Sequence, residues 1–153
     1  MAAQRLKDAR ASTFKGATAE AHRLGDRRIG TQHLLLALLH NPISLAAQTL
    51  DIDLDRARAA LTELDRAALA AIGLDAAPLD EPVPVESRRR PPFTSGAKHV
   101  VHQAAERARN ERAGRVHERH LLAALLTLKP PDPAAELFDA LGIDTADALH
   151  HLD

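Results

Sequence analysis

The sequence contains no cysteine, tryptophan or tyrosine, and it has only three phenylalanines among 153 residues. The absence of cysteine excludes disulfide bonds, thiolate metal sites and a thiol nucleophile, and it is typical of cytosolic proteins. With so few aromatic residues, a core drawn from the 45% hydrophobic content must consist mainly of alanine and leucine. Both residues lose little side-chain freedom in a helix, so the composition favours an all-α fold.

The chain also lacks a charge excess of either sign and any long apolar run. It carries 20 basic and 21 acidic residues, so no net field would attract nucleic acid or an anionic membrane. No apolar segment approaches the length of a transmembrane helix, and the N-terminus lacks the apolar core of a signal peptide. We therefore expect a cytoplasmic protein that binds neither nucleic acid nor membrane.

Several catalytic motifs are missing as well. A P-loop is excluded, because none of the four lysines follows a glycine or precedes serine or threonine: Lys7, Lys15, Lys98 and Lys129. No Gly-x-Ser-x-Gly elbow is present, so a nucleophilic triad of that type is excluded too. These absences predict a protein that is not an enzyme and that has no catalytic residues, bound metal or cofactor.

The clearest positive feature is an internal repeat. The segment 30–39 reads GTQHLLLALL, and the segment 117–126 reads HERHLLAALL in the same frame. Two such units are each too small to bury their apolar faces alone, so they should pack against each other. We predict a first repeat at 1–74, a linker with five prolines at 75–92 and a second repeat at 93–153, together forming one compact domain.

Apolar residues at helical spacing, bounded by capping residues, predict four helices in each repeat. Thr31, Asp53, Thr94 and Asp132 are the expected N-caps, and Pro133 suits a first helical position. The expected helices are Lys7–Leu24, Thr31 to Asn41, Ile43–Leu50, Asp53–Ile72, Thr94 onward, His117 or Glu118 to Leu128, Asp132–Gly142 and Asp144–His150.

Three short motifs carry a resemblance to a known family. They are Gly30-Thr31-Gln32-His33-Leu34-Leu35, Phe93-Thr94-x-x-Ala97-Lys98 and Leu141-Gly142-Ile143. Over roughly residues 6–72 and 93–153, the chain resembles the amino-terminal domain of Clp AAA+ unfoldases of the ClpC and ClpA type. The resemblance implies an eight-helix, pseudo-twofold bundle that receives substrates, adaptors or peptide ligands for an unfolding ring. If the chain is complete, it is a stand-alone accessory, regulator or ligand-sequestering decoy in ATP-dependent proteolysis.

The resemblance also implies where partners bind. Related domains hold peptides at the pseudo-twofold junction, and the corresponding positions here are Phe93, Thr94, Lys98 and Val101, with Phe14 matching Val101 in the first repeat. The family phenylalanine is kept as Phe93 and replaced by Leu6 in the first repeat, which favours a groove beside the second repeat. The expected ligands are unfolded or peptide segments, an adaptor or Clp unfoldase, and cyclic peptides.

The family motif at the start of the second helix of each repeat departs from its usual pattern. In some related domains an acidic residue of this motif binds phosphorylated arginine, but here the position is Gln32 in one repeat and Arg119 in the other. We therefore expect weak phosphoarginine binding. The remaining motif positions are Thr31, His33, Glu118 and His120, and the two histidines are expected to fasten the helix start by a hydrogen bond.

Two other functions remain open from the residues themselves. His117 and His120 stand at i, i+3 beside Glu118 and could serve a metal-dependent hydrolase, although the zincin spacing is absent. A helical DNA-binding regulator could use Arg27-Arg28 or the arginines after residue 106. However, the second repeat has nine acidic and seven basic residues, which argues against contacts to DNA phosphates. We expect Arg88-Arg89-Arg90 to be a solvated part of the linker.

Overall fold

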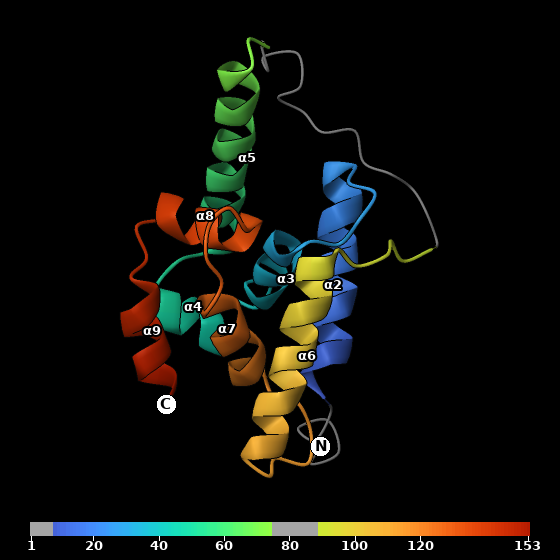
Figure 1. The fold of residues 1–153 in the computed structure, drawn as a ribbon, viewed down its shortest axis with the longest axis vertical. Helices are drawn as coiled ribbons and strands as arrows, with labels where there is room; N and C mark the ends of the chain where they lie inside the picture. The colour runs from blue at the N-terminus through green and yellow to red at the C-terminus, as the bar shows by residue number, and fades with distance from the viewer. Residues whose placement is uncertain (1–7, 75–88) are drawn as a thin grey trace.

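The computed structural model of the protein describes residues 8–74 and 89–153, and all regular secondary structure in this part is helical (Figure 1). The predictions for Leu6, Lys7 and most of the proline-rich segment fall on residues 1–7 and 75–88, outside the described ranges. The predicted eight-helix, all-α architecture is confirmed. The helices are α2 (Ala9–Leu24), α3 (Thr31–Leu38), α4 (Leu45–Leu50), α5 (Leu54–Ala71), α6 (Ser95–Asn110), α7 (Glu118–Leu126), α8 (Pro133–Ala140) and α9 (Thr145–Leu152).

Most helix starts follow the predicted capping chemistry. The side chains of Asp53, Thr94 and Asp132 accept backbone N–H bonds at the starts of α5, α6 and α8, and Pro133 opens α8. The third helix begins at Leu45 rather than Ile43, because Ser44 caps it through the N–H of Ala47. The boundaries of α3, α7 and α9 differ from the expected ones by two or three residues at their C-terminal ends.

The prediction that Thr31 is the N-cap of α3 is wrong. Gly30 occupies that position with extended backbone, and Thr31 is the first helical residue. The backbone N–H of Gly30 is satisfied by the imidazole Nδ1 of His33 at 2.8 Å. Because a histidine from inside the first turn performs the capping, the hydroxyl of Thr31 is free to bond elsewhere.

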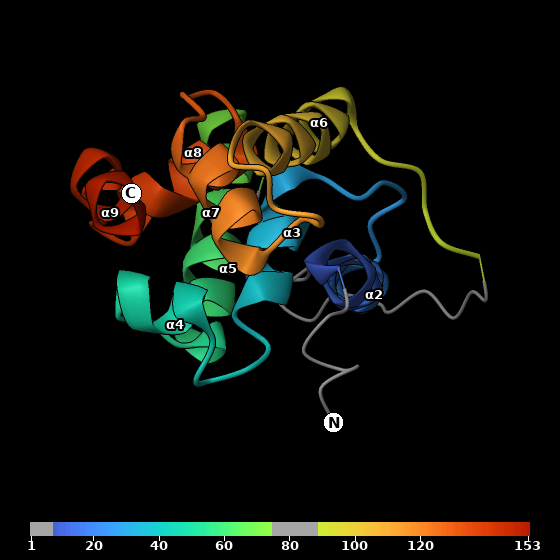
Figure 2. The same ribbon diagram turned by 90° about the horizontal axis from the view of Figure 1, so that it is seen from below.

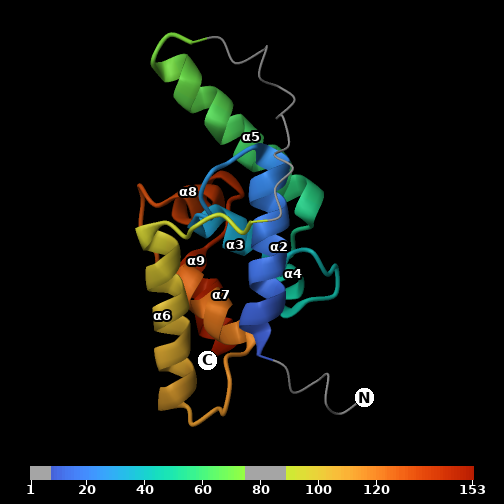
Figure 3. The ribbon, with the colours of Figure 1, turned by 90° about the vertical axis from the view of Figure 1, so that its right-hand side faces the viewer.

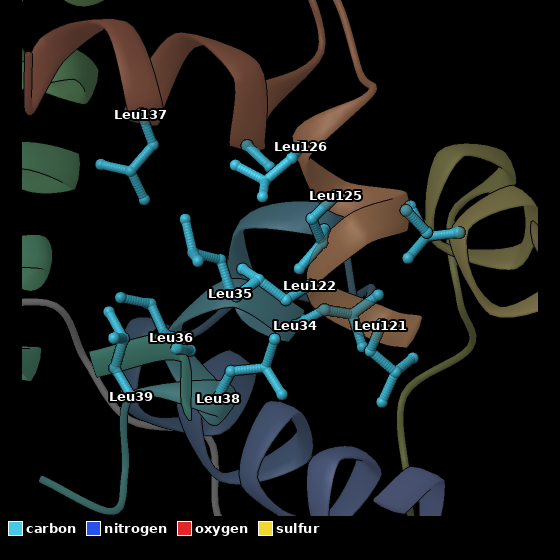
Figure 4. Close-up of a cluster of buried hydrophobic side chains, with 14 of the residues drawn as sticks. Leu34, Leu35, Leu36, Leu38, Leu39, Leu121, Leu122, Leu125, Leu126 and Leu137 are labelled. Carbon is cyan, nitrogen blue, oxygen red and sulfur yellow. The ribbon is translucent and has the colours of Figure 1, made fainter. Parts of the chain in front are cut away.

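The core is a leucine cluster shared by the two repeats. Helices α3 and α7 lie at the centre, with α2 and α6 on either side of them (Figure 3). Viewed from below, α8 and α9 pack beside α7, and α4 lies on the opposite side of α7 from α6 (Figure 2). Leu34 and Leu35 of α3 lie beside Leu121, Leu122 and Leu125 of α7 (Figure 4). Nine leucines from these two segments are almost fully buried: Leu34, Leu35, Leu36, Leu38, Leu39, Leu121, Leu122, Leu125 and Leu126.

The loop before each central helix pairs with the start of the other repeat. The backbone of Ile29 donates to the carbonyl of Pro92 at 2.8 Å and accepts from the N–H of Thr94 at 2.9 Å. Val116 occupies the matching place before α7, and its carbonyl accepts the N–H of Ala9 at 2.8 Å. Each repeat therefore fixes the position at which the first helix of the other begins.

A second pair of cross-repeat bonds caps the short helices α4 and α8. The hydroxyl of Thr31 accepts the N–H of Ala134 at 3.1 Å, and the carboxylate of Glu118 accepts the N–H of Ala46 at 2.9 Å. Ala46 and Ala134 are both the second residue of their helix, and Thr31 and Glu118 are both the first residue of theirs. The four-helix repeats are thus joined by equivalent contacts across a pseudo-twofold axis.

Within the first repeat, a buried carboxylate joins α2, α5 and the loop that follows α3. Glu20 is 1% exposed and bonds to Arg58 of α5, to Arg23 at 3.1 Å and to the ring of His40 at 2.8 Å. Burial acts to raise the pKa of Glu20, but these three hydrogen bonds and the charge of Arg58 lower it below its ordinary value. Glu20 is therefore ionised and holds together three segments of chain.

Helix α5 packs only through its first half. Ala57 and Leu61 are buried, whereas Ile72 at the far end is 72% exposed. The helix extends away from the other seven (Figures 1 and 3). The apolar stripe predicted along this helix is therefore packed against the core only as far as Leu64.

We predict that Glu118→Ala lowers the free energy of unfolding by about 1 kcal/mol, because the buried N–H of Ala46 loses its acceptor. Urea denaturation followed by circular dichroism measures this change. Asp139→Ala is the matched control, since Asp139 is an exposed acidic residue within α8. Equal stability of the two variants would contradict the capping role of Glu118.

We predict that Glu20→Gln destabilises the protein by roughly 2 kcal/mol at pH 7, because Arg58, Arg23 and His40 lose the carboxylate to which all three bond. The pKa of Glu20 is lower in the folded state, so its contribution is fully present above about pH 4.5 and is lost as the pH falls through the folded value.

The difference in unfolding free energy between wild type and Glu20→Gln should accordingly shrink below pH 4. Glu63→Gln serves as the control, because Glu63 is exposed and pairs only with the exposed Arg66. A difference that is independent of pH between 7 and 3 would rule out an ionised Glu20 as its source.

Candidate partner-binding site

Two of the three phenylalanines meet at the surface between the repeats. Phe14 lies on α2 and Phe93 directly before α6, and their ring centroids are 5.0 Å apart in an edge-to-face arrangement. Both rings are partly exposed, whereas the third phenylalanine, Phe138, is fully buried in the core. We call Phe14 and Phe93 the Phe pair. Among the described residues, these are the two phenylalanines whose rings a partner could contact.

Local structure explains why the Phe pair forms. Phe93 is held by the backbone bonds that Ile29 makes to its two neighbours in sequence, so its ring cannot move far from the start of α6. Phe14 is on the second turn of α2, whose first N–H groups are tied to Asp8 and Val116. The pairing therefore depends on contacts across the repeats, and neither repeat could produce it alone.

A basic side chain from the linker covers the Phe pair. The guanidinium carbon of Arg90 lies 5.1 Å from the ring centroid of Phe93 and 5.7 Å from that of Phe14. This cation–π geometry contributes about 0.5–1 kcal/mol at an exposed site. Sequence reasoning treated Arg90 only as part of a solvated arginine run. The signal that could have found it is its position three residues before Phe93.

An open pocket of about 530 Å³ adjoins the Phe pair, between α2 and the segment that carries Arg90. Its charged lining residues are Asp8, Arg10, Lys15 and Arg90. Asp8 accepts two hydrogen bonds from the Arg10 guanidinium, at 3.0 and 2.8 Å. Partial burial acts to raise the pKa of Asp8, but its bonds from Arg10 and from the N–H of Val116 lower the pKa to about 2.

The other predicted partner-binding residues are spread along α6. Thr94 caps the helix by accepting the N–H of Ala97 at 3.1 Å, so its hydroxyl has a structural role. Lys98 is exposed and Val101 is half-buried. The structure brings Phe14 and Phe93 into contact, but no ring contact, hydrogen bond or ion pair among the described residues joins Lys98 or Val101 to them.

The two motif histidines fasten the starts of α3 and α7. The Nδ1 atom of His120 accepts the N–H of His117 at 2.9 Å, and its Nε2 donates to Glu111 at 2.8 Å. His33 does the same with Gly30 and with Asp26, at 2.8 Å for each bond. Both imidazoles are about 1% exposed. The structural role expected for these histidines agrees with their geometry.

This geometry leaves His117, Glu118 and His120 poorly placed for metal chemistry. Both ring nitrogens of His120 already form hydrogen bonds, so neither has a free lone pair for a metal. The carboxylate of Glu118 is turned toward the start of α4. Burial and the neighbouring Arg119 lower the pKa of His117. Residues 8–74 and 89–153 contain no group of three potential ligands that could hold a metal ion.

The family's acidic motif position is occupied by residues that cannot replace a carboxylate. The amide oxygen of Gln32 is buried against Gly30 and has no hydrogen-bond partner among the described residues. It lines a second open pocket of about 650 Å³ beside the start of α6. Arg119 pairs with Glu111 at 2.6 Å, and hydrogen bonds from His120 and Arg119 lower the pKa of that glutamate.

None of the helices in the described residues is long and apolar enough to cross a membrane.

Comparison with known proteins finds a family match in the second repeat. Residues 92–153 match the family described as "Clp repeat (R) N-terminal domain". This match covers the second repeat, including Phe93 and the motif at α7. No curated protein sequence matches the chain significantly.

Solved structures extend the likeness to both repeats. The N-terminal domain of the caseinolytic protease associated chaperone ClpD from Arabidopsis thaliana superimposes with a TM-score of 0.66 at 23% identity, covering 98% of this chain and 99% of that one. A protein from a study of a malarial protein secretion system gives 0.64 at 15% identity, covering 93% and 88%. The Hsp104 N-terminal domain from Candida albicans gives 0.59 at 18% identity, covering 94% and 85%. The chain therefore has the fold of Clp and Hsp104 amino-terminal domains, and its second repeat matches the Clp repeat family.

Proposed function

We propose that this chain is a non-enzymatic module that binds segments of other proteins, and that the Phe pair is the centre of its binding surface. The observation that carries the proposal is the partial exposure of two contacting aromatic rings, whereas the third phenylalanine, Phe138, is fully buried. A ring that stays partly exposed contributes less to folding stability than a buried one. A partner that covers it would gain binding free energy from the burial of its apolar surface.

The likeness to Clp amino-terminal domains supports a protein or peptide as the partner. We propose that the module serves Clp-dependent proteolysis in the cytoplasm as an accessory, regulator or ligand-sequestering decoy. Its partners would be unfolded or peptide segments, an adaptor or Clp unfoldase, and cyclic peptides that imitate such segments. These 153 residues contain no P-loop, so the proposed role of this module is binding and not ATP hydrolysis.

Lys98, Thr94 and Val101 would take a secondary part. Lys98 is exposed on the first turn of α6 and can donate to a backbone carbonyl of a bound peptide, while Val101 offers a half-buried apolar side chain one turn further along. Thr94 would act indirectly, because it fixes the start of α6 next to Phe93.

We predict that Phe93→Ala and Phe14→Ala each weaken the binding of a permanently unfolded protein, such as reduced and carboxymethylated α-lactalbumin. A loss of about 1–2 kcal/mol, or roughly 5- to 30-fold in Kd, is expected from the aromatic area that a ligand would cover. Fluorescence anisotropy with labelled substrate measures it. Circular dichroism establishes that each variant keeps its helical content.

Ile72→Ala is the matched control, because it removes an exposed apolar side chain at the far end of α5. Its affinity should equal that of the wild type. If all three variants bind as the wild type does, the Phe pair is not the binding surface.

We further predict weak binding of phosphoarginine. The neutral Gln32 cannot form an ion pair with the ligand, and Arg119 carries the same charge as its guanidinium. Isothermal calorimetry should give a Kd in the millimolar range or weaker, and Gln32→Glu should tighten it. Tight binding by the wild type would show that the acidic motif position is dispensable.

A further inference from the structure

The pocket beside the Phe pair is lined by more positive than negative charge. Asp8 is engaged with Arg10 through both of its carboxylate oxygens, so this acid neutralises one of the three cations that line the pocket. Lys15 and Arg90 remain. No ion pair within residues 8–74 and 89–153 involves either of them, and both are exposed.

The two cations come from different segments of the chain and line the same pocket as Phe14. Lys15 follows Phe14 directly on α2, and Arg90 lies over both rings from the linker side. A peptide whose apolar side chain rests on the Phe pair would therefore bring its neighbouring side chains within reach of positive charge on either side. A carboxylate there would gain attraction, whereas a lysine or arginine would be repelled.

We infer that this surface selects peptide segments in which aspartate or glutamate flanks an aromatic or large aliphatic residue. The inference rests on the proposed function, since it names the class of segment that the same site prefers. Arg90 has two states in this scheme. It covers the rings in the free protein, and it turns to the ligand carboxylate when the apolar side chain takes its place on the Phe pair.

The arrangement also explains why a cation rather than an apolar side chain covers the rings. Cation–π contact protects the aromatic faces from nonspecific apolar association, yet the guanidinium remains hydrated enough to leave. A leucine at the same place would compete with the ligand by the same hydrophobic mechanism.

The test uses three labelled twelve-residue peptides that share a central Leu-Phe pair and differ only in four flanking residues, which are Asp and Glu, Ser and Gln, or Lys and Arg. Fluorescence anisotropy with the full chain should show the acidic peptide binding roughly five- to tenfold more tightly than the neutral one, and the basic peptide most weakly. Raising sodium chloride from 50 to 500 mM should remove most of this preference, because the charges involved are exposed.

The double variant Lys15→Glu/Arg90→Glu should reverse the order of the three peptides. Lys129→Glu is the control, since Lys129 is an exposed lysine between α7 and α8, outside the lining of this pocket. It should keep the wild-type order. The ratio between peptides is the readout, so a uniform loss of affinity from removing Arg90 does not affect the conclusion.

Each remaining outcome counts against a different part of the scheme. Equal binding of all three peptides by the wild type would overturn the charge preference and leave the proposed function standing. A preference that survives in the double variant would overturn its assignment to this pocket. If no peptide binds at any salt concentration, the proposed function fails and this inference fails with it.

Discussion

The burial of the α3 leucines against the α7 leucines is the contact on which the rest of this fold depends. Each central helix is eight or nine residues long and is apolar on nearly every side. Such a helix cannot be stable in water, because its length is below that at which isolated helices persist and its apolar surface needs full cover. The two central helices cover one another, and the outer helices complete the enclosure. We therefore expect the two repeats to depend on each other for stability and to unfold together.

Polar contacts then fix the relative orientation of the two repeats, which leucine packing alone would not define. Motif histidines close the starts of α3 and α7, while Thr31 and Glu118 cap helices of the opposite repeat. Hydrophobic packing is non-directional, whereas these bonds have defined donors and acceptors. The Phe pair benefits from the same precision, since its two rings come from different repeats and meet only when the repeats are correctly aligned.

Much of this architecture could be predicted from the sequence, because it is encoded locally. Helical periodicity and capping residues such as Asp53 and Asp132 identified the eight helices, and the repeated motif indicated two units. The role of Thr31 could not be predicted, because whether its hydroxyl caps its own helix or reaches Ala134 depends on a residue 103 positions away. Arg90 was missed for a related reason. Its position three residues before Phe93 signals a contact with one ring, whereas its contact with Phe14 depends on tertiary structure.

The unequal lengths of the two bridging side chains have a consequence for assembly. In one direction the bridge is a short threonine hydroxyl that works together with Asp132, and in the other it is a long glutamate that reaches the N–H of Ala46 unaided. Two identical copies of either half would bring together side chains of the wrong reach, leaving an amide without its acceptor or forcing a carboxylate into crowded space. We therefore expect each half to pair with the other half in preference to a second copy of itself.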